Sequence, residues 1–173
     1  MTGASHKTSV NAEMSMSPES KARMRRTEKD EYRYYNDMGR LGGNCTWGAG
    51  TMAHKGPCTE EELKTPVSAA AIEAAFARKV GEAERAVRRN VDKQVLTQAQ
   101  FDALVSLSYN AGPTGSKGTY AFVNSGDFAS AAANISSMTL VTVQTKAGST
   151  KVVARGLIKR RAEESAPFRV PQH

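Results

Sequence analysis

The 173-residue chain is poor in cysteine and in aromatic residues, and it has no long hydrophobic run. Its two cysteines are too few for the disulfide framework of a small secreted scaffold. No segment approaches the roughly 18 to 20 consecutive apolar residues that a transmembrane helix needs. The polar stretch over residues 1–20 has no apolar h-region, so it does not read as a secretory signal peptide. The 39% of hydrophobic residues is instead typical of one globular domain with its own core.

Basic residues are in excess, because 24 Lys and Arg against 17 Asp and Glu give a formal net charge of +7. A basic surface favours anionic partners, and both nucleic acid and the anionic bacterial cell wall fit that description. We find no zinc-finger spacing, no aromatic RNA-binding signature and no clear recognition helix. Nucleic-acid binding is therefore the remote alternative among the functions considered.

Cys45 and Cys58 bracket a short loop. They could form one disulfide in an oxidising compartment, or they could remain as two reduced thiols. A zinc site made of these two cysteines and His54 would have three ligands at an unusual spacing, whereas a structural zinc site has four. We therefore expect no metal ion and no cofactor.

Glycines and helix-capping residues divide the first half of the chain into expected elements. Residues 1–16 are rich in Ser, Thr and Lys, which predicts a flexible N-terminal tail before a domain over 17–170. A Ser-Pro pair is a helix start, and we expect the first helix over 17–34. Six glycines within 36–58 favour a small irregular β lobe with one strand over 46–52.

The second half of the chain is predicted to be mostly helical. Apolar residues at helical spacing and Ser or Thr caps predict two long helices, and the second of them should be central and buried. A polar connection, a short helix, an exposed β hairpin and a last helix follow. In order, these elements are expected over 69–90, 98–110, 115–124, 128–138, 139–155 and 156–166.

Three residues in the first half carry candidate chemistry. Glu28 lies near the predicted end of the first helix, Asp37 in the turn after it, and Thr46 on the next extended segment. Two carboxyl groups that flank a cleft are what hydrolysis of a glycosidic bond requires. Acidic pairs at this spacing are common, so the triplet becomes specific only together with the pattern downstream.

Four segments in the same order resemble the phage-type lysozymes, glycoside hydrolase family 24. They correspond to the family's Glu followed by Tyr-x-Asp, its Thr-x-Gly-x-Gly strand, its central helix and its Gly-Leu-x-x-Arg-Arg-x-x-Glu. In this chain they are Glu28–Asp37, Thr46–Gly50, Gln100–Gly112 and Gly156–Glu164. The resemblance covers about residues 20–168, and the gap between Asp37 and Thr46 is three residues longer than is usual in the family.

The resemblance implies an α+β, mostly α, lysozyme-like fold with a small β lobe, a larger helical lobe and an active-site cleft between them. It also implies hydrolysis of the β-1,4 bond between N-acetylmuramic acid and N-acetylglucosamine in peptidoglycan. Glu28 would be the general acid, while Asp37 and Thr46 would hold and activate the water that attacks from the opposite face. Such an arrangement inverts the anomeric centre.

Other residues at family positions would support this site. Arg160 or Arg161 could pair with Glu28 and fix the orientation of its carboxyl group. The residues that fall where the family lines its sugar cleft are Tyr109, Asn110 and Thr119.

Two other functions and two biological settings stay open. A lytic transglycosylase needs only the Glu and releases a 1,6-anhydro product, and a non-catalytic peptidoglycan-binding module would tolerate the loss of Glu28. A hydrolase made in the cytoplasm without a signal peptide could act on the wall in the periplasm as a phage endolysin. It could equally be an antibacterial effector injected into a rival cell, which would imply a cognate immunity protein in the producer.

Overall fold

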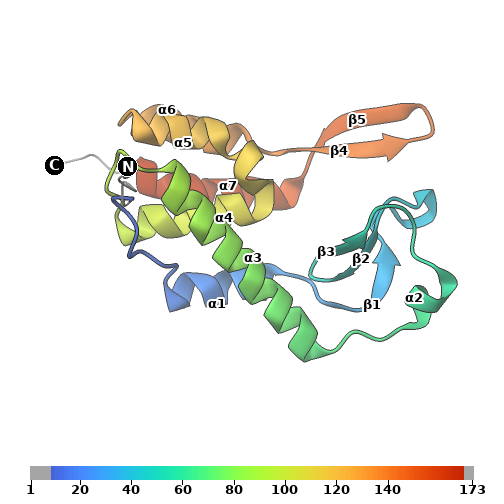
Figure 1. Ribbon diagram of the computed structural model, residues 1–173. Coiled ribbons are helices and arrows are strands. Elements are labelled where there is room, and N and C mark those ends of the chain that lie inside the picture. Colours follow the sequence, from blue (N-terminus) through green and yellow to red (C-terminus); the bar gives the residue numbers. More distant parts are fainter. Residues whose placement is uncertain (1–8, 170–173) are drawn as a thin grey trace, which may run out of the picture. The chain divides into compact units, whose positions relative to one another are not determined.

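The computed structural model in Figure 1 describes residues 9–169 of the chain. Helices predominate, and the strands form one three-stranded and one two-stranded sheet. Contacts divide the chain into a sheet unit, made of Lys21–Lys79 and Thr142–Val152, and a helical unit, made of the rest. None of the helices described combines the length and the apolar character that crossing a membrane requires. The α+β, mostly helical class predicted from the sequence is confirmed.

The sheet unit is built on three short antiparallel strands in the order β1-β2-β3 (Figure 1). Gly48, at the end of the central strand, lies so close to Ile72 that a Cβ on residue 48 would be 3.1 Å from the Ile72 side chain. This close approach joins the sheet to the first half of α3. The elements are α1 (Pro18–Thr27), β1 (Glu31–Asn36), the 3-10 helix η1 (Gly39–Leu41), β2 (Cys45–Gly48), β3 (Thr51–His54), α2 (Glu60–Lys64) and α3 (Ala69–Asn90), of which α1 and α3 extend into the helical unit.

Two predictions for the sheet unit are wrong. The first helix ends at Thr27 and not near residue 34, because the tyrosine-rich β1 pairs with β2, where Tyr35 lies opposite Thr46. The single strand expected over 46–52 is two strands, because the chain turns at Gly50. Gly50 has φ +82°, a left-handed conformation that favours glycine.

The helical unit is organised around α4 (Gln98–Gly115), whose residues Phe101, Leu104 and Leu107 are fully buried. The predicted capping box at Thr97 is present, and the helix bends at Gly112, where φ is +74° and a proline follows. The predicted central, buried helix is thus confirmed. The remaining helices of this unit are α5 (Lys117–Asn124), α6 (Phe128–Ser137), α7 (Arg155–Ser165) and the 3-10 helix η2 (Ala166–Phe168).

The segment 115–124, which we predicted to be a polar connection, forms the helix α5. Its buried side chains are Thr119, Tyr120 and Val123, and they recur at helical spacing. The glycine, serine and threonine content of this segment concealed its apolar face, so the prediction is wrong.

Residues 9–16, the described part of the predicted tail, pack within the helical unit. Asn11 is buried, and its side-chain amide donates hydrogen bonds to the backbone oxygens of Val91 and Gln94, each at 2.9 Å. A buried amide that joins two carbonyl groups far along the chain fixes this segment in place. Residues 1–8 of the predicted tail lie outside the described residues.

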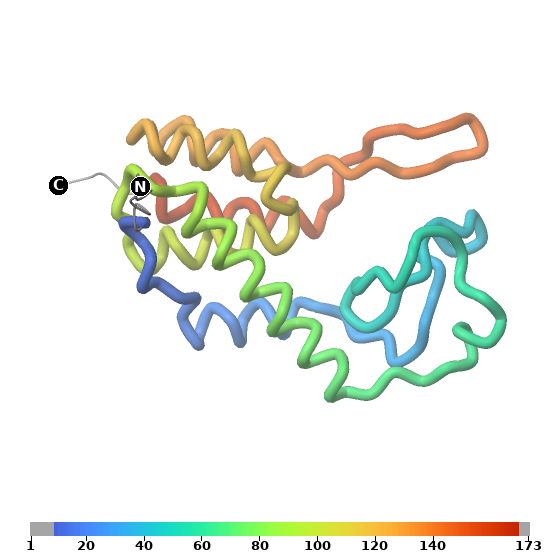
Figure 2. Tube along the Cα trace, in the orientation of Figure 1, coloured from blue at the N-terminus to red at the C-terminus, as the bar shows by residue number. Residues whose placement is uncertain are grey.

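The predicted hairpin is confirmed as β4 (Leu140–Thr145) and β5 (Gly148–Val153), which Figure 2 traces as one continuous ribbon of chain. Most of its side chains are exposed, as expected. The predicted caps are also present: the Ser68 hydroxyl accepts from the N–H of the third residue of α3, and the Asp127 carboxylate does the same for α6.

Candidate active site

Asp37 follows the last residue of β1, where the chain enters the loop that leads to β2. Its Oδ1 accepts a hydrogen bond from the backbone N–H of Asn44 at 2.8 Å, and its own N–H donates to the Asn44 oxygen at 3.1 Å. Gly43 lies directly against this carboxylate, because a Cβ on residue 43 would be 2.1 Å from Asp37 Oδ1. The loop backbone therefore fixes one carboxylate oxygen of an otherwise exposed residue.

Thr46 lies in the central strand β2, opposite Tyr35 of β1, and only 4% of it is exposed. Its hydroxyl donates a hydrogen bond to the backbone oxygen of Asn44 at 3.3 Å. Asn44 thus binds Asp37 through its N–H and Thr46 through its oxygen. Two of the three predicted catalytic residues are joined through this one residue.

Tyr35 adds a neutral hydroxyl group near this pair. Burial, followed by the negative charges of Glu31 and Asp37, raises the pKa of the Tyr35 phenol above its usual value. The phenol therefore keeps its proton near neutral pH.

Glu28 lies in the short segment between α1 and β1, and its N–H donates to the Arg25 oxygen at 3.3 Å. The guanidinium of Arg25 donates to Asp30, at the other end of this segment, at 3.1 and 2.8 Å. It also donates to Glu73 of α3 at 2.8 and 2.5 Å. These hydrogen bonds raise the pKa of Arg25 above the already high value of an ordinary arginine, so the side chain is always charged. The guanidinium also lies over the ring of Phe76, 5.6 Å from its centre. Glu28 is thus carried by a segment that one arginine anchors at both ends.

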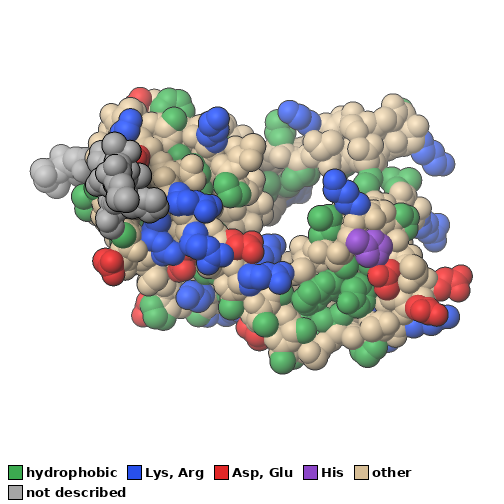
Figure 3. Space-filling view, in the orientation of Figure 1, with side chains coloured by type: hydrophobic (Ala, Val, Ile, Leu, Met, Phe, Trp, Pro, Cys, Tyr) green, Lys and Arg blue, Asp and Glu red, His purple; other side chains and the backbone are tan. Residues whose placement is uncertain are grey.

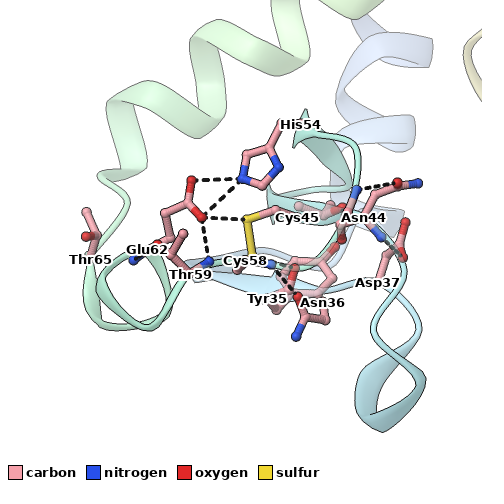
Figure 4. The surroundings of a disulfide bond; sticks show 12 residues. Tyr35, Asn36, Asp37, Asn44, Cys45, His54, Cys58, Thr59, Glu62 and Thr65 are labelled. Carbon is pink, nitrogen blue, oxygen red and sulfur yellow. Dashed lines mark hydrogen bonds and ion pairs between the residues drawn. A yellow bond between two sulfur atoms is a disulfide. The ribbon is translucent and has the colours of Figure 1, made fainter.

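Cys45 and Cys58, for which the sequence left open a disulfide or two thiols, form a disulfide with a Cα–Cα distance of 4.6 Å (Figure 4). The Cys58 N–H donates to Asn36 Oδ1 at 2.8 Å, and the Cys45 N–H donates to the Gly56 oxygen at 2.8 Å. The Gly56 N–H in turn donates to Asn44 Oδ1 at 3.2 Å. The disulfide loop therefore braces the ends of β1 and β2 that carry the carboxylate and the hydroxyl.

Arg161 forms a buried ion pair with Glu164 in the helical unit, with Nη1 and Oε2 2.6 Å apart and each side chain 3% exposed. Its other nitrogens donate to the Met138 oxygen at 2.9 Å and to Asn110 Oδ1 at 2.5 Å. All three guanidinium nitrogens of Arg161 are therefore used within the helical unit, where they join α4, α6 and α7.

Arg160 donates to the second oxygen of Glu164 at 3.1 Å and to the backbone oxygen of Ser106 at 3.2 Å. The Arg-Arg-x-x-Glu pattern is thus explained by one carboxylate that binds two arginines. The predicted pairing of either arginine with Glu28 stays a prediction.

The three predicted sugar-binding residues differ in exposure. Asn110 is exposed, and Tyr109 is 9% exposed. Thr119 is fully buried, and its hydroxyl donates to Asn134 Oδ1 at 2.7 Å. A direct contact between Thr119 and a glycan would require this packing to open, so its burial argues against that contact.

Three residues of the sheet unit around the candidate site were missed by the sequence analysis. They are Arg25, Gly43 and Asn44. Arg25 lies three residues before Glu28, and two adjacent glycines before Asn44 signal an unusual loop, but neither signal shows which residue is contacted. Asn44 binds Asp37 and Thr46 through its backbone, and such contacts leave no mark in the sequence.

The fold and the candidate site together indicate a glycoside hydrolase of the lysozyme type: Glu28 precedes a tyrosine-rich strand, Asp37 follows it, and the buried Thr46 lies on the neighbouring strand. The family model of the phage lysozymes matches residues 25–164, and the chain belongs to this family. The protein is therefore a glycoside hydrolase that acts on peptidoglycan. No curated protein sequence matches the chain.

Solved structures similar to the chain support this assignment. The endolysin from Escherichia coli O157:H7 phage FAHEc1 is 27% identical, with a TM-score of 0.69 over 91% of this chain and 94% of that chain. The muramidase domain of SpmX from Asticaccaulis excentricus is 25% identical, with a TM-score of 0.64 over 90% and 98%. P22 lysozyme, at 21% identity and a TM-score of 0.59 over 90% and 98%, shares the fold.

Proposed function

We propose that the protein is an inverting muramidase in which Glu28 is the general acid and Asp37 and Thr46 position the attacking water. The substrate bond is the β-1,4 linkage between N-acetylmuramic acid and N-acetylglucosamine. The observation that carries the proposal is the pair of hydrogen bonds through which Asn44 joins the Asp37 carboxylate to the Thr46 hydroxyl. We expect this carboxylate and this hydroxyl, both bound to Asn44, to hold one water molecule between them.

In this mechanism Glu28 donates its proton to the glycosidic oxygen as the bond to the anomeric carbon breaks. Water adds to the opposite face of the anomeric carbon and loses a proton to Asp37, so the configuration inverts. The Asn44 N–H holds Asp37 Oδ1, and the second oxygen of Asp37 is the one that receives this proton. Asn110, which is exposed, is our candidate for a contact with the glycan.

The test is mass spectrometry of the soluble products that the protein and its Glu28→Gln variant release from purified peptidoglycan. Products with reducing N-acetylmuramic acid ends, absent from the variant, are expected. Glu31→Gln is the matched control, because Glu31 is a neighbouring carboxylate whose described ion pair is with the exposed Lys29. This control should keep most of the activity.

Other product patterns would contradict the proposal. Anhydro ends would mean a lytic transglycosylase, for which water activation by Asp37 and Thr46 is unnecessary. Unchanged hydrolysis by Glu28→Gln would remove Glu28 as the acid. The configuration of the first product, followed by nuclear magnetic resonance, should be the α anomer, and a β anomer would exclude inversion.

We further propose that the protein works in the oxidising periplasm, as an endolysin. The Cys45–Cys58 disulfide and the likeness to the phage FAHEc1 endolysin support this setting. An injected effector is the alternative, and its producer would need a cognate immunity protein. The test is to direct the protein to the periplasm of a laboratory host and of the bacterium that naturally produces it. Lysis of both is expected for an endolysin. Survival of the natural producer only would indicate an immunity protein.

A further inference from the structure

The two disulfide cysteines and two neighbouring side chains in Figure 4 carry atoms that can bind a metal ion. They come from β2, β3, the loop after β3 and α2, and none of them belongs to the proposed catalytic triplet. We call this group the Cys–His–Glu cluster; it consists of Cys45, His54, Cys58 and Glu62.

The distances within the Cys–His–Glu cluster are those of atoms that can share one ion. Cys45 Sγ lies 3.8 Å from Glu62 Oε2, and His54 Nε2 lies 2.9 Å from Glu62 Oε1. The ligating atoms of these three residues all fall within 4.8 Å of one another. Ligand atoms around a tetrahedral zinc ion are about 3.3 to 3.8 Å apart, given zinc–ligand bonds of roughly 2.0 to 2.3 Å. Small side-chain rotations would therefore suffice for these three residues, and Cys58 enters through its bond to Cys45.

We propose that, once the disulfide is reduced, the Cys–His–Glu cluster binds one zinc ion as a four-ligand structural site. Two thiolates, one imidazole and one carboxylate in a tetrahedron are a ligand set suited to zinc, which accepts sulfur, nitrogen and oxygen alike. The sequence offered only three of these ligands, because Glu62 is brought to the cluster by the fold.

The surroundings already orient two of the four ligands. The ring of His54 contacts the Lys55 oxygen through Nδ1 at 3.0 Å, and an N–H donated there leaves Nε2 as the ligating nitrogen. Glu62 is held by the capping box of α2, in which the Thr59 N–H donates to Oε2 at 2.7 Å and leaves Oε1 for the metal. Such outer contacts are what ordered metal sites use to fix their ligands.

The backbone and the surface also suit the cluster. Cys45 and His54 are paired residues of the β2–β3 ladder, so their Cα atoms are held opposite each other. Cys45 is buried, but 42% of the His54 side chain and 30% of the Glu62 side chain are exposed. An ion can therefore reach the cluster from solvent without unfolding the sheet.

Reduction of the Cys45–Cys58 disulfide needs a source of two electrons, and a dithiol can supply them. The dithiol transfers two electrons and two protons to the disulfide, which becomes two thiols, and the dithiol is itself oxidised to a disulfide. Zinc binding then displaces one proton from each thiol and the Nε2 proton that His54 donates to Glu62, so that His54 binds as the neutral imidazole and Glu62 as the carboxylate. Zinc would thus clamp β2, β3 and α2 wherever the covalent bond is absent.

The test begins with the full chain reduced by a phosphine under anaerobic conditions and titrated with Co²⁺ as the spectroscopic probe. One equivalent is expected to give thiolate-to-cobalt charge-transfer absorption and the visible bands of tetrahedral cobalt, and Zn²⁺ should abolish both. His54→Gln and Glu62→Gln should each weaken binding by more than about 100-fold, since even outer-shell partners contribute 10- to 100-fold. The oxidised protein should bind no metal at this site.

Glu61→Gln is the matched control, because Glu61 lies beside Glu62 on the same exposed helix but outside the cluster. It should bind cobalt as the unaltered protein does. The His54 and Glu62 variants keep both cysteines, so their folding can be checked in the oxidised form. Absence of binding to the reduced protein, or equal binding by these variants, would overturn the proposal, as would equal binding by the oxidised protein.

Discussion

At the scale of single residues, the position of the Asp37 carboxylate depends on the absence of a side chain at Gly43. A methyl group on residue 43 would lie 2.1 Å from Asp37 Oδ1, so the carboxylate must move by an ångström or more. We expect Gly43→Ala to lower kcat on peptidoglycan by about 100-fold, since displacements of this size have that effect on catalytic groups. The measurement is the initial rate at which the variant and the unaltered protein solubilise peptidoglycan.

The matched control for this change is Gly39→Ala in the same loop. Gly39 also has a positive φ, of +56°, but a Cβ there would meet no atom within 4 Å. Both variants should lose a similar stability, about 1 kcal/mol, from the left-handed backbone. If Gly39→Ala were as inactive as Gly43→Ala, backbone strain and not the displaced carboxylate would be the cause.

The candidate catalytic residues could be named from the sequence, whereas the contacts that hold them could not. Glu28, Asp37 and Thr46 were found because their residue types and spacing form part of a longer pattern. Asn44 holds two of them through its N–H and oxygen, groups that almost every residue carries. Its role therefore becomes visible only when the loop between β1 and β2 is seen folded.

At the scale of helices and strands, elements with strong local sequence signals were predicted correctly, whereas segments with ambiguous composition were not. The capping boxes of α2 and α4 consist of Thr followed three residues later by Glu or Gln, and the start of α4 was predicted correctly from one of them. The segment Glu31–Asn36 has a charged and aromatic composition that suits either a helix end or a strand. Pairing with β2 decides between them, and this long-range contact is not written in the segment itself.

Arg25 connects three elements, because it lies in the last turn of α1 and binds Asp30 before β1 and Glu73 on α3. In Arg25→Gln these two carboxylates lose their shared partner and the segment that carries Glu28 loses its anchor. We expect kcat to fall by about 10-fold or more with little change in KM. The free energy of unfolding should fall by about 1–2 kcal/mol, chiefly through Asp30, because solvent screens the 59% exposed Glu73.

The control for this prediction is Arg26→Gln, which removes an exposed arginine from the same turn of α1. It should leave kcat unchanged. A loss of stability in Arg25→Gln without any loss of kcat would show that Arg25 serves the fold alone and does not position Glu28.

At the scale of the whole molecule, part of the excess positive charge is gathered in one region of the surface. Figure 3 shows Lys and Arg side chains gathered on the face of the helical unit where the second half of α3 runs. Among the basic residues of the second half of α3, Arg85 and Arg89 are exposed. The net charge of +7 can be read from the sequence, but which basic side chains lie together on the surface follows from the fold. A basic face of this kind attracts an anionic wall from a distance.

Hydrolysis of intact walls should therefore depend on salt. Between about 0.01 and 0.15 M ionic strength the screening length falls from about 30 to 8 Å, so we expect the initial rate on sacculi to fall several-fold. Arg85→Gln/Arg89→Gln should be slower at low salt and less sensitive to added salt. Glu60→Gln/Glu61→Gln, on exposed residues of α2, raises the net charge by two units where the arginine variant lowers it by two, and it should keep the full salt dependence. Equal salt dependence in the arginine variant would mean that attraction arises elsewhere on the surface, and a salt-independent rate would mean that encounter with the wall does not limit hydrolysis.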